Sequence, residues 1–175
     1  MTKRSSLFDE ANSFGWISIL LHWSTALAII VLWFIGKSIA FQSPELVDAR
    51  RTLHVTLGLI LWLPLAGRIV WRLVATHPRS SGQSLLTHQM ARAAHYLLLT
   101  MLGLMLISGP LLAWLSPLAG PMADTLLFVH ANTANVFAIL IGLHVLAALK
   151  HLMFHDDETV ARIFVPRRRE KIDKL

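Results

Sequence analysis

Four apolar stretches, each about as long as a lipid bilayer is thick, constrain the possible folds of this chain more than any other feature. They cover about residues 16–36, 53–74, 94–115 and 125–149. A helix needs about 20 residues to cross a bilayer, and only helices and closed barrels satisfy their backbone polar groups there. Short connections between the stretches predict an all-α, integral membrane, up-down bundle of four helices. We expect one membrane domain over residues 1–175, ending in a basic tail over 150–175.

Composition supports a membrane protein and excludes several kinds of site. Hydrophobic residues make up 55% of the 175 residues and charged residues only 15%, and mean hydropathy is +0.58. Soluble domains are more polar than this. The chain has no cysteine, which excludes disulfides, iron–sulfur clusters and covalent haem attachment through a C-x-x-C-H motif. The net charge of +6 fits membrane orientation better than nucleic-acid binding, so no nucleic-acid partner is expected.

The basic residues predict how the bundle is oriented. Most of the 16 Lys and Arg residues lie on the side that holds both termini and the connection between the second and third stretches. The opposite side holds Lys37, Arg50 and Arg51. The positive-inside rule therefore places both termini in the cytoplasm of a bacterial inner-membrane protein. The first apolar run is too long for a cleaved signal peptide, and no small-residue cleavage pattern follows it before Lys37.

Histidines occur within the apolar stretches at two matching depths. His22 and His144 each lie about six residues from the expected cytoplasmic ends of their stretches, roughly 9 Å deep. His54 and His130 lie near the periplasmic ends. On one helix, His130 and His144 would be only about 40° apart around the axis and roughly 21 Å apart along it. The sequence therefore predicts two polar sites stacked across the membrane.

Two facing neutral imidazoles are the axial ligands that a bis-histidine haem requires. We therefore expect two haem groups, with His22 and His144 binding one iron and His54 and His130 the other. Small residues one turn from these histidines would leave room for the rings: Ala26, Gly58, Ala134, Ala147 and Ala148. Alternatively, each histidine could form hydrogen bonds between helices or lie at an interface. A simple metal-ion site is less favoured, because the four stretches contain no Asp or Glu.

Several other residues near the cytoplasmic side could serve these sites. Arg68 lies about one turn deeper than Arg72 and is expected to have an anionic partner such as a haem propionate, whereas Arg72 could be an interfacial anchor. His95 could form a hydrogen bond to a cofactor carboxylate or simply lie at the interface. His151 could contact a quinone headgroup or only extend to the membrane surface. The remaining histidines are expected in loops or the tail: His77, His88 and His155.

The motifs together resemble the bacterial cytochrome b561 family of four-helix, di-haem membrane cytochromes. The resemblance covers nearly the whole chain and is carried by Leu21-His22-Trp23, Leu53-His54-Val55 with Gly58, Ala94-His95-Tyr96, His130 with Ala134-Asn135, Gly142-Leu143-His144 followed by His151, and Pro166-Arg167-Arg168-Arg169-Glu170. It implies b-type haem bound by His22, His54, His130 and His144.

The resemblance also implies a function. Some members look like superoxide:ubiquinone oxidoreductases, so we expect electron transfer from periplasmic superoxide to ubiquinone. Arg50 and Arg51 could steer the anion, or they could only solvate the loop and pair with a haem propionate. The alternative is a cytochrome subunit that relays electrons between a periplasmic redox partner and the quinone pool. A haem-free transporter or scaffold is a more distant alternative.

Overall fold

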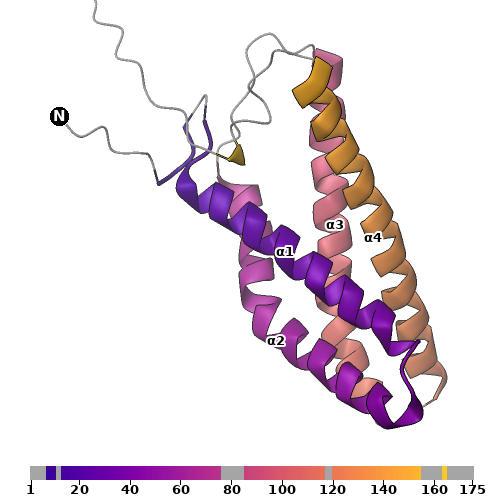
Figure 1. Cartoon of the computed structure of the whole chain (residues 1–175). Helices are drawn as coiled ribbons and strands as arrows, with labels where there is room; N and C mark the ends of the chain where they lie inside the picture. The colour runs from indigo at the N-terminus through magenta and orange to yellow at the C-terminus, as the bar shows by residue number, and fades with distance from the viewer. Residues whose placement is uncertain (1–6, 11–12, 76–84, 117–119, 155–162, 165–175) are drawn as a thin grey trace, which may run out of the picture.

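The computed structural model describes residues 7–10, 13–75, 85–116, 120–154 and 163–164. This part of the chain consists of four long helices: α1 (Trp16–Ile39), α2 (Pro44–Val74), α3 (Leu85–Leu115) and α4 (Pro121–Phe154). All four are long and apolar enough to cross a membrane. Consecutive helices run in opposite directions, so α1 begins and α4 ends at the same end of the molecule (Figure 1). The predicted all-α fold with four membrane helices is therefore confirmed.

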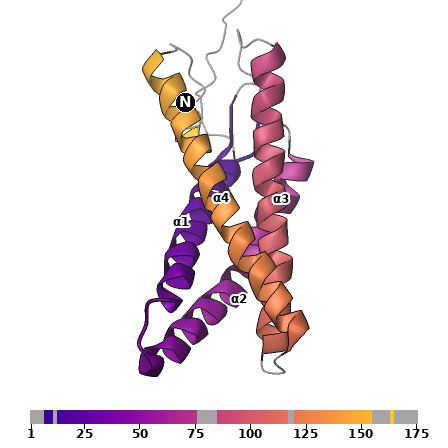
Figure 2. The ribbon, with the colours of Figure 1, turned by 90° about the vertical axis from the view of Figure 1, so that its right-hand side faces the viewer.

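The two ends of the bundle differ in what they hold. We call the end with the start of α1 and the end of α4 the terminal end, and the opposite one the loop end. Figure 1 shows the loop end at the bottom, where α1 connects to α2 and α3 to α4. The closest packing joins α1 to α2 and α3 to α4, and α2 packs against α3 (Figure 2). Helices α1 and α4 pack much less closely than these pairs, although they carry two of the predicted site residues.

The helices extend beyond the predicted apolar stretches, because polar residues also suit their first turns. The sequence predicts a polar connection over 37–51, but α2 already begins at Pro44, after Ser43. Proline is favoured in a first helical turn, and Glu45 complements the positive end of the helix dipole. Likewise α3 begins at Leu85, so His88 lies on a helix and not in a loop. Of the other two histidines assigned to loops, His77 and His155 lie outside the described residues.

The centre of the bundle is a thin apolar layer. Each helix contributes one buried residue to it: Ala28, Leu65, Leu102 and Phe137. Many large apolar side chains elsewhere are exposed, including Leu63 and Trp114 at 73% each. Exposed apolar surface on this scale is unfavourable in water but suits contact with lipid. The small core therefore joins helices whose outer faces are suited to the membrane.

A short segment before α1 is fastened to the terminal end. The carboxylate of Asp9 accepts hydrogen bonds of 2.7 Å from the Gly15 backbone N–H and from the Ser18 hydroxyl. The Trp71 indole N–H on α2 donates to the same Ser18 hydroxyl at 2.7 Å. A Cβ at Gly15 would collide with the backbone of residues 7 and 8. Asp9 thus fastens the preceding segment to the first turn of α1, and Ser18 links that turn to the end of α2.

We expect Asp9→Ala to lower the free energy of unfolding by about 1–2 kcal/mol, because the first turn of α1 loses its side-chain acceptor. Thermal unfolding of the detergent-solubilised protein would measure this. The matched control is Asp48→Ala, since Asp48 is exposed and pairs with Arg51 only one turn away. Such surface pairs contribute about 0–1 kcal/mol. Equal effects of the two substitutions would show that the hydrogen bonds of Asp9 do not stabilise the start of α1.

Candidate functional site

The histidines of the loop end face each other from α2 and α4. The ring centroids of His54 and His130 are 6.2 Å apart, with an angle of 84° between the ring planes. Two glycines allow helix backbone to lie against these rings. A Cβ at Gly36 on α1 would be 3.0 Å from Cε1 of His54, and a Cβ at Gly109 on α3 would be 3.3 Å from Cε1 of His130. All four helices therefore contribute to this site.

The histidines of the terminal end come from three helices. The ring centroids of His22 on α1 and His144 on α4 are 6.4 Å apart, with an interplanar angle of 59°. His95 on α3 is closer to His144, at 5.2 Å and 79°. Its Nδ1 lies 2.6 Å from the Ala91 backbone carbonyl, one turn earlier on α3. A carbonyl only accepts hydrogen bonds, so Nδ1 of His95 carries a proton and donates it.

Two arginines of α2 belong to the terminal end. Arg68 is half-buried and close enough to His22 and His95 to interact with both electrostatically. Arg72 lies one turn further along and also acts on His95. The Asp9 carboxylate is near both guanidinium groups. The terminal-end pair therefore lies in a positive environment, whereas none of the described Lys and Arg side chains interacts closely with the loop-end pair.

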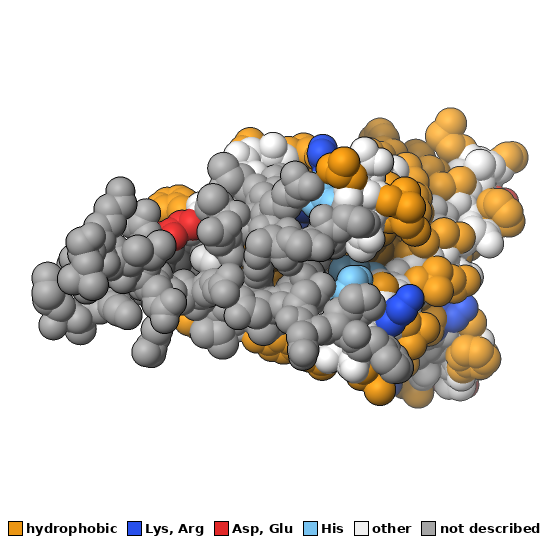
Figure 3. Space-filling model, turned by 90° about the horizontal axis from the view of Figure 1, so that it is seen from above, with side chains coloured by type: hydrophobic (Ala, Val, Ile, Leu, Met, Phe, Trp, Pro, Cys, Tyr) orange, Lys and Arg blue, Asp and Glu red, His pale blue; other side chains and the backbone are white. Residues whose placement is uncertain are grey.

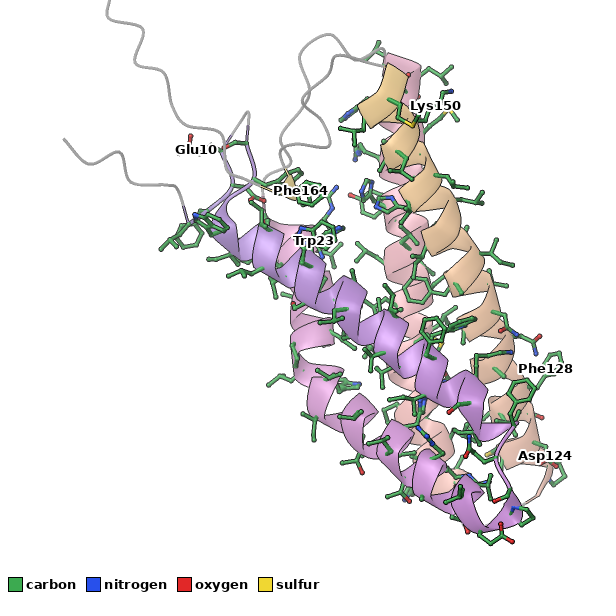
Figure 4. All side chains as sticks on the ribbon, in the orientation of Figure 1. Glu10, Trp23, Asp124, Phe128, Lys150 and Phe164 are labelled. Atoms are coloured by element: carbon green, nitrogen blue, oxygen red, sulfur yellow. The ribbon has the colours of Figure 1, made fainter. Side chains whose placement is uncertain are left out.

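The opposite ends of α4 can be followed in Figure 4. Asp124 and Phe128 lie at its loop end, near the His130 level, and Lys150 lies at its terminal end, beyond His144. His151 follows Lys150 and is half-buried. Figure 3 looks onto the terminal end and shows His together with Lys or Arg side chains among the described residues there. His151 therefore lies beyond the level of the terminal-end pair, as its position in the sequence predicts.

Sequence reasoning missed a contact between the two termini. The Trp23 indole N–H donates a 2.9 Å hydrogen bond to the backbone carbonyl of Ile163, and its ring lies 4.9 Å from that of Phe164. Figure 4 shows Trp23 and Phe164 side by side at the terminal end. Because Trp23 follows His22 directly, this contact brings residues 163–164 next to the terminal-end site. The separation of 140 residues explains why local sequence patterns could not indicate it.

The glycines and Ser108 around the loop-end pair were also missed. The sequence pointed to small residues one turn away from each histidine, including Gly58. A Cβ at Gly58 would meet nothing within 4 Å, so this position is open. The close approaches come instead from Gly36 and Gly109 on other helices. A glycine within an apolar stretch gives no indication of the neighbouring helix that it faces.

The fold and the two histidine pairs define a class of membrane protein in which histidines at two depths face a common interior. The sequence model for prokaryotic cytochrome b561 matches residues 13–166. Cytochrome b561 homolog 2 of Escherichia coli (strain K12) is 28% identical, over 90% of this chain and 94% of that protein. The chain belongs to the prokaryotic cytochrome b561 family. It is a multi-pass, b-type membrane cytochrome, and the family implies haem b as its cofactor.

The glycine contacts give a test of the loop-end site. We expect Gly36→Ala to force the His54 ring to move, because the added Cβ would lie 3.0 Å from Cε1. The absorption and electron paramagnetic resonance (EPR) signals of the bound haem b should then change. Gly103→Ala is the matched control, since a Cβ there meets nothing within 4 Å. Normal signals from Gly36→Ala would contradict close contact at this site.

Proposed function

We propose that this cytochrome binds two b-type haems and carries electrons between the two faces of the membrane. His22 and His144 would hold one haem at the terminal end, and His54 and His130 the other at the loop end. The observation that carries the proposal is the arrangement of two histidine pairs at opposite ends of one bundle, each joining α4 to another helix. Haem bound in this way supplies one-electron oxidation and reduction.

The spacing of the rings supports two-imidazole ligation. A metal–imidazole bond is about 2.0–2.1 Å long and the ring centroid lies roughly 1.1 Å behind the nitrogen, so two rings that bind one metal ion from opposite sides have centroids roughly 6.3 Å apart. The two pairs have separations of 6.4 and 6.2 Å. His95 and His144, at 5.2 Å, are too close for this arrangement. The spacing therefore favours His22, not His95, as the partner of His144.

The remaining residues of each site would position and shield the haems. Helix α4 holds one ligand of each pair, so its rise sets their separation of roughly 21 Å along the axis. The apolar layer around Phe137 lies between them and excludes water. At the terminal end, Arg68 would attract a haem propionate, and His95 would contact the same carboxylate if its second nitrogen is protonated. The side chains of Phe137, Arg68 and His95 are neither oxidised nor reduced in this function.

The charge distribution favours a definite orientation. We place the terminal end in the cytoplasm, because most Lys and Arg residues lie on that side. The loop end would then face the periplasm. There Lys37 donates a 3.4 Å hydrogen bond to the Asn135 side chain, which joins α1 to α4, and Arg50 is exposed. Positive side chains at this end would attract a small anion.

We therefore favour superoxide as the electron donor at the loop end and ubiquinone as the acceptor at the terminal end. The connection between α1 and α2 covers only residues 40–43, which offers a protein partner little surface. His151, beyond the terminal-end pair, would contact the quinone headgroup. A relay from a periplasmic redox protein is the competing function, and it would need a docking surface larger than this connection.

The ligand assignment predicts a paired loss of haem. We expect His54→Ala and His130→Ala to lose the same single haem, and His22→Ala and His144→Ala to lose the other, because both histidines of a pair would hold its haem. Haem content per chain and reduced-minus-oxidised spectra would measure this. His88→Ala is the control, since His88 lies on α3 outside both pairs. Loss of the same haem from His22→Ala and His54→Ala would overturn the pairing, and a parent protein without haem would overturn the proposal.

Superoxide oxidation predicts rapid haem reduction when the oxidised protein is mixed with superoxide in a stopped-flow instrument. Replacing Lys37, Arg50 and Arg51 together by Gln should slow the bimolecular reaction several-fold at low salt and much less at high salt, since screening weakens steering. A control replacement of Arg92 and Lys150 by Gln, at the terminal end, should leave the rate unchanged. If the haem of the unmodified protein stays oxidised after mixing with superoxide, the superoxide reaction is excluded and a relay of electrons from a periplasmic redox protein is favoured.

A further inference from the structure

A buried serine lies directly behind one of the histidines of the loop-end pair. Ser108 on α3 is only 5% exposed. Its Oγ lies 2.9 Å from Nδ1 of His130 on α4. The same hydroxyl donates a 2.7 Å hydrogen bond to the backbone carbonyl of Leu104, one turn earlier on α3. Ser108 therefore links the imidazole of α4 to the backbone of α3.

Counting the protons determines the direction of this contact. A serine hydroxyl has a single hydrogen and can accept through its oxygen lone pairs. Because that hydrogen points to the Leu104 carbonyl, Oγ can only accept from His130. Nδ1 of His130 must then carry the ring proton of the neutral imidazole, and Nε2 must carry the lone pair. This tautomer has its free lone pair at the ring nitrogen remote from Ser108.

We propose that Ser108 is a positioning residue that holds His130 in the tautomer able to ligate iron through Nε2. The inference rests on the proposed role of His130 as a haem ligand. A hydrogen bond accepted from Nδ1–H also makes the ring a stronger electron donor at Nε2, which is the usual effect of a group behind a metal-bound histidine. Ser108 thereby stabilises the oxidised iron and lowers the reduction potential of the loop-end haem.

The opposing ligand lacks an equivalent partner. Nδ1 of His54 is buried and has no hydroxyl group behind it among the described residues, and the backbone of Leu32 on α1 is the polar group that lies near its ring. Gly36 lies against this ring as Gly109 lies against that of His130, so the two rings are confined alike. The two ligands of this haem therefore differ in the group behind the ring, a serine hydroxyl for His130 and helix backbone for His54. Ser108 is thus a residue through which the chain can adjust this haem separately from the other.

Redox titration of Ser108→Ala in the intact, haem-loaded protein tests the proposal. The reduction potential of the loop-end haem should rise. The expected change is about tenfold in the equilibrium constant for its reduction, which corresponds to 59 mV for one electron. The EPR signal of the same ferric haem should also shift. The terminal-end haem should keep its potential and signal. The His54→Ala variant, which retains only the terminal-end haem, identifies which signals belong to each.

Two further variants separate this role from helix packing. Ser108→Thr keeps the hydroxyl and should retain values close to those of the parent. Thr100→Ala removes a similar hydroxyl on α3, which donates to the Tyr96 carbonyl at 2.9 Å and touches no histidine, and it should change neither potential. Loss of the loop-end haem from Ser108→Ala alone, with Ser108→Thr loaded normally, would also support the proposal.

Other outcomes would overturn it. Two haems with unchanged potentials in Ser108→Ala would show that the hydrogen bond does not act on the iron. Equal shifts or equal haem loss in the Ala and Thr variants would indicate packing, and a shift of both haems would indicate a general structural change. A parent protein that binds no haem would instead overturn the proposed function, so the two failures can be told apart.

Discussion

An imidazole inside a lipid bilayer needs a polar partner or a ligand, because the surrounding hydrocarbon can form no hydrogen bond with it. This constraint explains why the histidines of the four helices do not face outward at random. They meet in pairs, His22 with His144 and His54 with His130. In a family of b-type cytochromes, iron ligation is the interaction that would use both members of a pair. The rest of the bundle can be understood as the support for these two pairs.

Helix α4 is central to that support. It carries one histidine of each pair and, about midway between them, the buried Phe137. Positions seven residues apart on a helix lie within about 20° of each other, so all three share one face. The layer formed by Phe137 with Ala28 and Leu65 separates the two polar sites with apolar atoms. One helix thereby sets both the alignment of the sites and the distance that electrons would cross.

The surroundings of the two pairs differ in a way that could separate their potentials. Arg68 lies near the terminal-end pair, and its positive charge would favour the reduced form of a nearby haem. At the loop end the nearest polar support is the neutral Ser108, whose hydrogen bond to His130 would favour the oxidised form. Together these contacts would direct electrons from the loop end toward the terminal end, the direction required for reduction of quinone at the cytoplasmic face.

The sequence by itself determined the membrane class, the four helices and the places of His22, His54, His130 and His144 along them, because hydrophobic length and helical rise depend only on residues along one segment. It placed the starts of α2 and α3 too late. The residues from Pro44 and from Leu85 up to the apolar stretches include many polar side chains, yet they form helix. Only the tertiary structure decided which helices meet across the interior. Gly36 against His54, Ser108 behind His130 and Trp23 against Ile163 depend on helix rotation and crossing, which arise from packing between segments distant in sequence.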